Sequence, residues 1–168
     1  GTMLLPGAGF DVVPTDCLAN KLKSELPSAT HLEMAFASKG GGLSRGTAKT
    51  SVAGMGHGTL KRIAGKLVSV PLKKQEKLID FGAFTAQCLP IPWGDLETAW
   101  VSTKIPNIAV YTPFGKKTRK HLGKLSKIMR LGFVRRMALF AIEKRMYGPT
   151  ESERENSPTY IVGKVWND

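Results

Sequence analysis

The first stretch of this sequence that could bind a ligand is Gly7-Ala8-Gly9-Phe10-Asp11-Val12, which follows a short apolar run. It has two of the three glycines of a dinucleotide-binding fingerprint. The third glycine, which lets a helix approach the preceding strand, is replaced by Val12, and Pro14 interrupts the start of the following helix. The stretch is therefore predicted to be a strained turn that points its backbone at a ligand, and not a pyrophosphate-binding loop.

A second glycine-rich stretch covers residues 41–46 and has the outer spacing of a phosphate-binding P-loop. The next two residues are Thr47 and Ala48, where that motif requires lysine and then serine or threonine, so nucleotide triphosphate hydrolysis is excluded. Arg45 remains beside backbone N–H groups at a predicted helix start, an arrangement that favours an anion. The alternative is that these residues form only a flexible connection.

The third stretch, Pro90-Ile91-Pro92-Trp93-Gly94-Asp95, is the most constrained part of the chain. Two prolines fix the backbone, the tryptophan contributes a large ring, and the aspartate is predicted to cap a helix. Such a rigid loop can line a pocket, and it can equally form a corner around a core. The residue types do not decide between these two roles.

The remaining reactive side chains give no recognisable catalytic group. His31, His57 and His121 are too dispersed for a metal site, and no acid–base pair can be assigned, so the catalytic residues are left unspecified. Cys17 is predicted to lie on the core-facing side of a helix. With Cys88 it makes only two cysteines, too few for a disulfide framework.

The chain has 168 residues and a formal net charge of +12, and its composition is that of a folded domain. The charge is concentrated: residues 116–145 contain 11 basic side chains and one acidic side chain, Glu143, so they carry most of the excess. No apolar stretch reaches the roughly 20 residues that cross a bilayer, and no signal peptide opens the sequence. A reducing cytoplasm is the expected location.

The basic segment also contains the one long helical pattern, at residues 122–146. We expect a helix that packs on the sheet and has a solvated basic rim. The alternative is an amphipathic helix that binds a membrane surface or a protein partner. Nucleic acid is the least favoured partner, because no exposed aromatic platform is expected beside the charge.

The other elements are expected to be strands and helices in irregular order, which indicates an α+β domain. Its sheet is predicted to be mixed and largely antiparallel, with helices packed on one side. Strands are expected at residues 3–5, 30–38, 60–63, 66–70, 77–81, 85–89, 107–111 and 160–166, and helices at 14–26, 44–54 and 95–100. A polar loop is expected at 151–157. Because the last strand has no evident partner, residues 1–168 are interpreted as one domain of a longer protein.

Four motifs in order resemble the saccharopine dehydrogenase-like oxidoreductases, a family that includes the trans-acting enoyl reductases. The motifs are Gly9-Phe10-Asp11-Val12-Val13-Pro14-Thr15-Asp16, Ser44-Arg45-Gly46-Thr47-Ala48, Ile91-Pro92-Trp93-Gly94-Asp95 and Ile105-Pro106-Asn107-Ile108. The resemblance covers nearly the whole chain. It implies a two-part oxidoreductase in which a Rossmann domain binds NAD(P) and a second, α+β domain closes over the nicotinamide and the substrate.

The chain resembles only the second part, so the resemblance implies that a Rossmann domain is its partner and that this chain alone binds no dinucleotide tightly and is inactive. It places a loop with Gly9, Phe10, Asp11, Pro14 and Asp16 beside the nicotinamide. It places on the substrate side the residues Ser44, Arg45, Gly46, Thr47, Pro92, Trp93, Gly94, Asp95 and Asn107. Self-association and an anionic membrane surface are the further partners to expect.

Overall fold

The computed structural model describes residues 12–40, 44–54, 58–72 and 75–168 of the chain. The strand predicted at residues 3–5 lies outside the described residues, as do the turn residues Gly9, Phe10 and Asp11. The described residues form α1 (Val13–Glu25), β1 (His31–Ser38), α2 (Arg45–Gly54), β2 (Thr59–Ile63), β3 (Lys66–Val70), β4 (Lys77–Asp80), β5 (Thr85–Pro90), α3 (Asp95–Thr103), β6 (Asn107–Pro113), α4 (Lys116–Ile128), α5 (Gly132–Arg145), α6 (Glu151–Glu155) and β7 (Thr159–Trp166).

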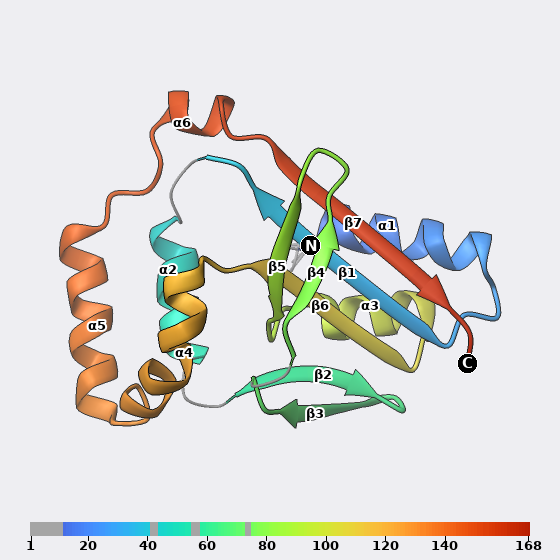
Figure 1. Ribbon diagram of the computed structural model, residues 1–168, viewed down its shortest axis with the longest axis horizontal. Helices are drawn as coiled ribbons and strands as arrows, with labels where there is room; N and C mark the ends of the chain where they lie inside the picture. The colour runs from blue at the N-terminus through green and yellow to red at the C-terminus, as the bar shows by residue number, and fades with distance from the viewer. Residues whose placement is uncertain (1–11, 41–43, 55–57, 73–74) are drawn as a thin grey trace, which may run out of the picture.

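The strands form one open sheet in which β6 is central (Figure 1). β1 pairs with β6 in parallel and with β7 in antiparallel orientation, and every other strand pair is antiparallel. The second edge of β6 is shared, because β2 pairs near its start and β5 pairs near its end. The prediction of an α+β fold with a mixed, largely antiparallel sheet is confirmed.

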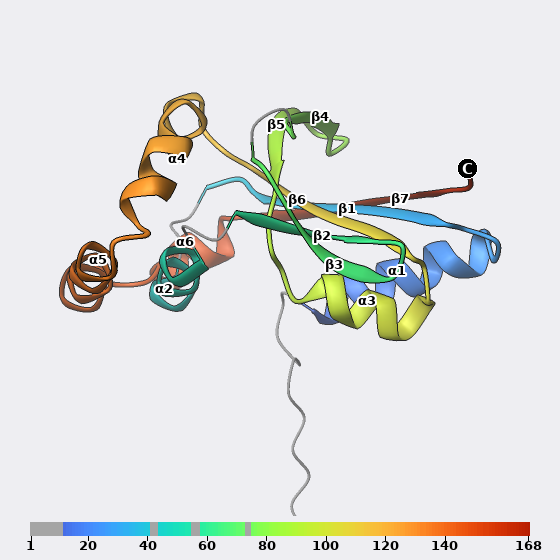
Figure 2. The same ribbon diagram turned by 90° about the horizontal axis from the view of Figure 1, so that it is seen from below.

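Helices α1 and α3 pack together and cover one face of the sheet (Figure 2). Between them and the strands lies the larger core cluster, which contains Leu32 and Met34 from β1, Leu96 from α3 and Val110 from β6. These side chains are at most 2% exposed. Their burial drives the packing, because each large apolar side chain removed from water contributes about 1.5–3 kcal/mol.

The opposite face is covered in part by the β4–β5 hairpin (Figure 2). A second core cluster lies there, with Ala35 and Ala37 from β1 and with Phe81 and Cys88 from the hairpin segment. In the sequence, Leu32, Met34 and Phe36 alternate with His31, Glu33 and Ala35, a pattern that predicts a strand with one buried face. That prediction is wrong for the second half of β1, because the hairpin buries Ala35 and Ala37 on the other face.

The other four helices gather beyond one end of the sheet (Figures 1 and 2). There α5 packs on α2, and no α5 residue is buried. The predictions that the helices pack on one side and that the basic helix packs on the sheet are therefore wrong for this group. The partly buried apolar residues of α5 pack against another helix instead of against a sheet face.

The single helix predicted at residues 122–146 is two helices, α4 and α5. Met129 ends the α4 hydrogen bonding, and Leu131 is extended, with φ −73° and ψ 112°. Gly132, a poor helix former, then begins α5. The break changes the chain direction, and this allows α5 to lie against α2.

Two predictions near the C-terminus are also wrong. The last strand, β7, does have a partner: it pairs with β1 over its whole length, from Thr159 opposite Ser38 to Trp166 opposite His31. The predicted polar loop is the short helix α6. Thr150 and Glu153 start it by bonding to each other's backbone N–H groups, at 3.3 and 2.8 Å.

Within the described part of the chain, no helix combines the length and the apolar character that a membrane span requires. The cytoplasmic location remains a prediction.

Candidate functional site

An apolar pocket of about 140 Å³ lies where α2, α4 and the segment between β5 and α3 meet. Helix α2 contributes Thr50, Ser51 and Gly54, and residues 90–93 form another wall. The remaining lining comes from Gly58, Thr59, Leu72, Phe114, Leu122 and Ser126. Of the three stretches singled out in the sequence, only the third, residues 90–95, therefore lines the pocket within the described part of the chain, and the helix that follows the second stretch contributes another wall.

The wall formed by residues 90–93 is rigid for local reasons. Pro90 ends β5 opposite Tyr111, and the Ile91 N–H donates to the Val110 carbonyl at 2.9 Å, so the segment stays attached to β6. The half-buried ring of Trp93 packs on Phe36 of β1, with 5.0 Å between the ring centroids. Both alternatives left open by the sequence are therefore correct, because this segment forms a corner of the core on one side and a wall of the pocket on the other.

The hydroxyl groups of the pocket already serve the fold. Thr50 donates to the Gly46 carbonyl at 3.1 Å, and Ser51 donates to the Thr47 carbonyl at 2.8 Å within α2. Thr59 donates to the Pro90 carbonyl at 2.9 Å. Among the described lining residues there is no ionisable side chain. The pocket can hold an apolar group about the size of a benzene ring. Its lining can bind such a group by shape complementarity and has no side chain suited to proton transfer.

The first motif meets the third beside this pocket. The Thr15 hydroxyl donates a hydrogen bond to the Asp95 carboxylate, and both side chains are almost completely buried. A Cβ at Gly94 would lie 3.6 Å from a methyl group of Val12, so the backbones also approach closely. The start of α1 is thereby fixed against the start of α3.

Asp95 was predicted to cap α3 with its side chain, and this is wrong. Gly94 is the residue before the helix, and its cap carries no side-chain hydrogen bond. The carboxylate instead turns inward to Thr15. Cys17 was predicted to be core and is exposed. The buried positions of α1 are Thr15 and Ala19, and Cys17, midway between them, therefore lies on the outer side of the helix.

Of the loop expected to face the nicotinamide, the described residues are Pro14 and Asp16. Pro14 lies in the first turn of α1, where its missing N–H costs nothing. The Asp16 carboxylate accepts hydrogen bonds from Ser102 of α3 at 2.8 and 2.9 Å. Asp16 thus joins α1 to α3, whereas Pro14 serves the start of α1.

The second motif starts α2 and does not itself line the pocket. The Ser44 hydroxyl accepts the Thr47 N–H at 3.1 Å and bonds the Thr47 hydroxyl at 2.8 Å. Arg45 lies 3.8 Å from the Glu143 carboxylate of α5, which Lys49 also contacts. Gly46 is exposed. In this structure the positive charge of Arg45 is directed at α5, and the following turns of the helix reach the pocket.

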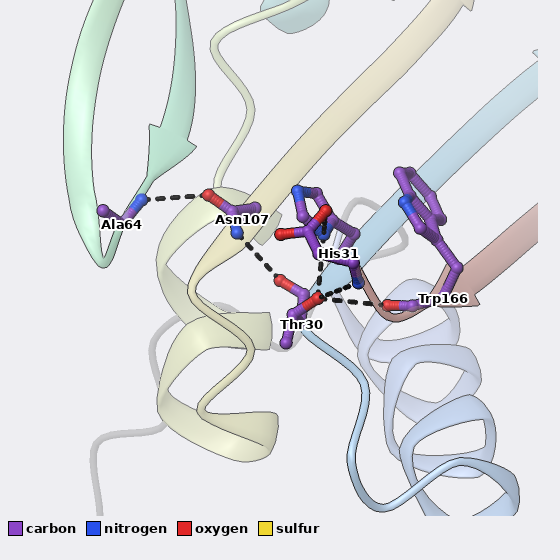
Figure 3. A network of polar contacts seen from close by, with 6 residues as sticks. Thr30, His31, Ala64, Asn107 and Trp166 are labelled. Carbon is purple, nitrogen blue, oxygen red and sulfur yellow. Dashed lines mark hydrogen bonds and ion pairs between the residues drawn. The ribbon is translucent and has the colours of Figure 1, made fainter.

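Asn107 lies at the other end of β1 and β6, away from the remaining candidates (Figure 3). Its amide donates to the Thr30 carbonyl and accepts the Ala64 N–H, each at 3.0 Å. Its role in the fold is to fasten the turn between β2 and β3 to the start of β1. The Thr30 hydroxyl also contacts His31, whose ring stacks on Trp166 with 5.0 Å between centroids.

The structure brings together one group of ionisable residues that the sequence patterns did not indicate. Glu33, Lys61, Lys77 and Tyr111 come from four strands and meet on the face under the β4–β5 hairpin. Lys77 pairs with the Glu33 carboxylate, and Lys61 lies 5.4 Å from the centre of the Tyr111 ring. Burial, with the nearby Glu33 charge, raises the pKa of Tyr111 to about 12. Burial also lowers the pKa of Lys61.

No family model matches this chain, and no curated protein matches it either. The resemblance to the saccharopine dehydrogenase-like oxidoreductases therefore remains a prediction that depends on the four motifs alone. Three of these motifs, the first, second and third, belong to the elements that surround or adjoin the pocket.

Proposed function

We propose that this chain is the substrate-side domain of an NAD(P)-dependent oxidoreductase of the saccharopine dehydrogenase-like kind. The apolar pocket holds the apolar part of the substrate. The observation that carries the proposal is that the third motif forms one wall of the cavity at residues 91–93 and is held to the first motif by the buried Thr15–Asp95 contact. Sites of this kind are expected where two domains meet.

The chemistry of the pocket agrees with such a role. Hydride transfer is carried out by the nicotinamide, so the protein must chiefly position the substrate and exclude water. A rigid apolar wall with Trp93 and Ile91 does both without an ionisable side chain. The sequence contains no complete G-x-G-x-x-G motif, so dinucleotide binding is assigned to a separate Rossmann domain.

The cofactor part of the proposal is tested by titration calorimetry with NADPH and NADH. The 168-residue chain is expected to bind neither dinucleotide with a dissociation constant in the micromolar range or below. The protein that includes the Rossmann domain is expected to bind one of the two. Tight binding by this chain alone contradicts the assignment of dinucleotide binding to a separate domain. Absence of binding by the whole protein contradicts the oxidoreductase assignment itself.

The pocket part is tested with Gly54→Phe. Gly54 lines the pocket, and a Cβ at this position has no neighbour within 4 Å, so a ring can enter without displacing the backbone. The matched control is Gly123→Phe in α4, where a Cβ is equally free but outside the lining. Both variants leave the fold intact if their melting temperatures match that of the wild type.

The readout is NADPH consumption by the whole protein with aliphatic ketones and enones of increasing chain length. Gly54→Phe is expected to abolish turnover of the substrates that the wild type accepts, with NADPH affinity unchanged, while Gly123→Phe keeps wild-type activity. Equal activity of the two variants would show that this cavity does not hold the substrate.

A further inference from the structure

Helix α5 has apolar side chains on two opposite sides, and only one of them is used by the fold. At about 100° per residue, Ala138, Leu139 and Ile142 lie on the side opposite Phe133 and Met137. The former three are half-buried, and the helix packs on α2. The other side has no covering element among the described residues, because Phe133 and Met137 are 66% and 68% exposed.

The uncovered side forms a continuous surface, which we call the outer face of α5. It consists of Phe133, Arg136, Met137, Phe140, Lys144 and Arg145 around a shallow apolar depression. Before α5, Ile128 at the end of α4 and Leu131 at the start of α5 are also exposed, at 50% and 53%. Single exposed apolar residues need no explanation, but a row of this length on one helix marks an interaction surface.

The charge around the outer face has one sign. The segment of residues 116–145 has a single acidic side chain, Glu143, and that carboxylate is engaged by Lys49 and Arg45 of α2. Arg136, Lys144 and Arg145 are exposed within the outer face itself. A partner for this surface must therefore combine apolar volume with negative charge.

A second copy of the chain fits poorly, because two such faces would bring like charges together at the centre of an interface, where charged residues are normally depleted. Nucleic acid is also disfavoured. The exposed rings of Phe133 and Phe140 could stack on bases, contrary to the sequence expectation of no aromatic platform, but Ile128, Leu131 and Met137 between and beside them offer no stacking surface.

An acidic protein groove would need to enclose the helix, as in helix-in-groove recognition. The packing of α5 on α2 leaves one side available, so such enclosure is blocked. A lipid surface needs only that one side. Interfacial helices bury an apolar row at the level of the headgroups while lysine and arginine contact the anionic lipids.

We propose that the outer face of α5 docks on an anionic phospholipid bilayer, with the helix parallel to the surface. Phe133, Met137 and Phe140 enter the interfacial layer, and Arg136 and Lys144 contact the lipid phosphates and carboxylates. The helix is too short to span the bilayer, since 14 residues extend about 21 Å. This surface is separate from the pocket, so the proposal does not depend on the proposed reaction.

The test is flotation of the 168-residue chain with vesicles of phosphatidylcholine, with and without phosphatidylserine. Binding is expected only with phosphatidylserine, and it should weaken as salt is raised, because salt screens the attraction. The triple variant Phe133→Ser/Met137→Ser/Phe140→Ser is expected to bind about 100-fold more weakly. Its control, Leu78→Ser/Val101→Ser, changes side chains that are 60% and 63% exposed on other elements and should bind like the wild type.

The charge contribution is tested with Arg136→Gln/Lys144→Gln. Binding is expected to fall about 30-fold, which corresponds to about 1 kcal/mol for each basic residue near an anionic surface. The control Lys39→Gln/Lys66→Gln removes the same charge from exposed positions outside this segment and should have a much smaller effect. Circular dichroism melts show whether each variant is folded.

Four results overturn the proposal. One is wild-type binding by the triple serine variant, and another is equal binding to vesicles without phosphatidylserine. The third is a dimer, seen by sedimentation equilibrium, that the triple variant dissociates, because the outer face would then be covered by a second copy. An oligonucleotide that binds the outer face in place of the vesicles would likewise identify nucleic acid as the partner.

Discussion

The hydroxyl of Thr15 donates a hydrogen bond to the carboxylate of Asp95, eighty residues further along the chain. Thr15 is 1% exposed and Asp95 is 0% exposed, so this contact is made away from water. It holds the first turn of α1 against the first turn of α3, next to the segment that forms the pocket wall. The contact therefore fixes the first motif in place relative to the third.

Replacing Thr15 with valine should destabilise the protein by about 3 kcal/mol, because a buried carboxylate then loses its hydroxyl donor. The free energy of unfolding in urea measures the effect. Thr15→Ser, which keeps the hydroxyl, is the control and should cost about 1 kcal/mol or less. A neutral Thr15→Val would mean that this hydrogen bond does not stabilise the fold.

Trp93→Ala should cost about 2–3 kcal/mol, somewhat less than complete burial of the ring would imply. The ring contacts Phe36 and the main core on one side and lines the pocket on the other. Trp93→Phe retains an aromatic contact and should cost clearly less. Denaturant midpoints of the two variants check this, and equal midpoints would show that an aromatic ring at this position contributes nothing to stability.

The two cysteines should differ strongly in reactivity. Cys17 is exposed, whereas Cys88 is 0% exposed and burial raises its pKa to about 11. Near pH 8, an aromatic disulfide reagent should modify one thiol rapidly and the second only as the protein unfolds. Cys17→Ser should abolish the rapid phase. Two rapid phases in the wild type would contradict the burial of Cys88.

Tyr111 should make the protein less stable at high pH. Its pKa is raised to about 12, above its ordinary value near 10, so its stabilising contribution is complete below about pH 10 and is lost towards pH 12. A shift of this size corresponds to roughly 2–3 kcal/mol. Lys61 acts in the opposite direction, because burial lowers its pKa. The folded state loses the Lys61 proton at a lower pH than the unfolded state does, so this residue adds stability as the pH rises.

The comparison of Tyr111→Phe with the wild type isolates the tyrosine, since Lys61 is present in both. The difference in unfolding free energy between them should shift by roughly 2–3 kcal/mol between pH 10 and 12. A constant difference across this range would contradict the shift. Ultraviolet titration offers a second measure, in which the tyrosinate absorbance that Tyr111→Phe removes should develop near pH 12.

Much of the secondary structure could be predicted because it depends on local patterns. The turn between β2 and β3 is an example: Ala64 and Gly65 both have positive φ, at 48° and 77°, as a tight hairpin requires. The capping pattern of Thr150 and Glu153 was equally local and would have identified α6. The sequence interpretation missed it by treating a polar run as a loop.

Tertiary relationships could not be predicted in the same way. The helical pattern of residues 122–146 continues through Gly132, and only the packing of α5 on α2 explains why the chain turns there. The pocket was missed in part because Gly54, Phe114 and Leu122 carry no reactive group and are brought together by the fold. Asn107 was selected with the site because it belongs to a motif, but its contacts are with the backbone of the sheet and hairpin.

The pairing of β1 with β7 has a consequence for how the protein is made. During translation, β1 leaves the ribosome more than one hundred residues before its antiparallel neighbour, so one side of that strand keeps unsatisfied hydrogen-bonding groups until β7 has been made. Such a strand can associate with other nascent chains. Premature termination before Thr159 would leave this strand edge permanently exposed, and β7 therefore protects the protein from aggregation.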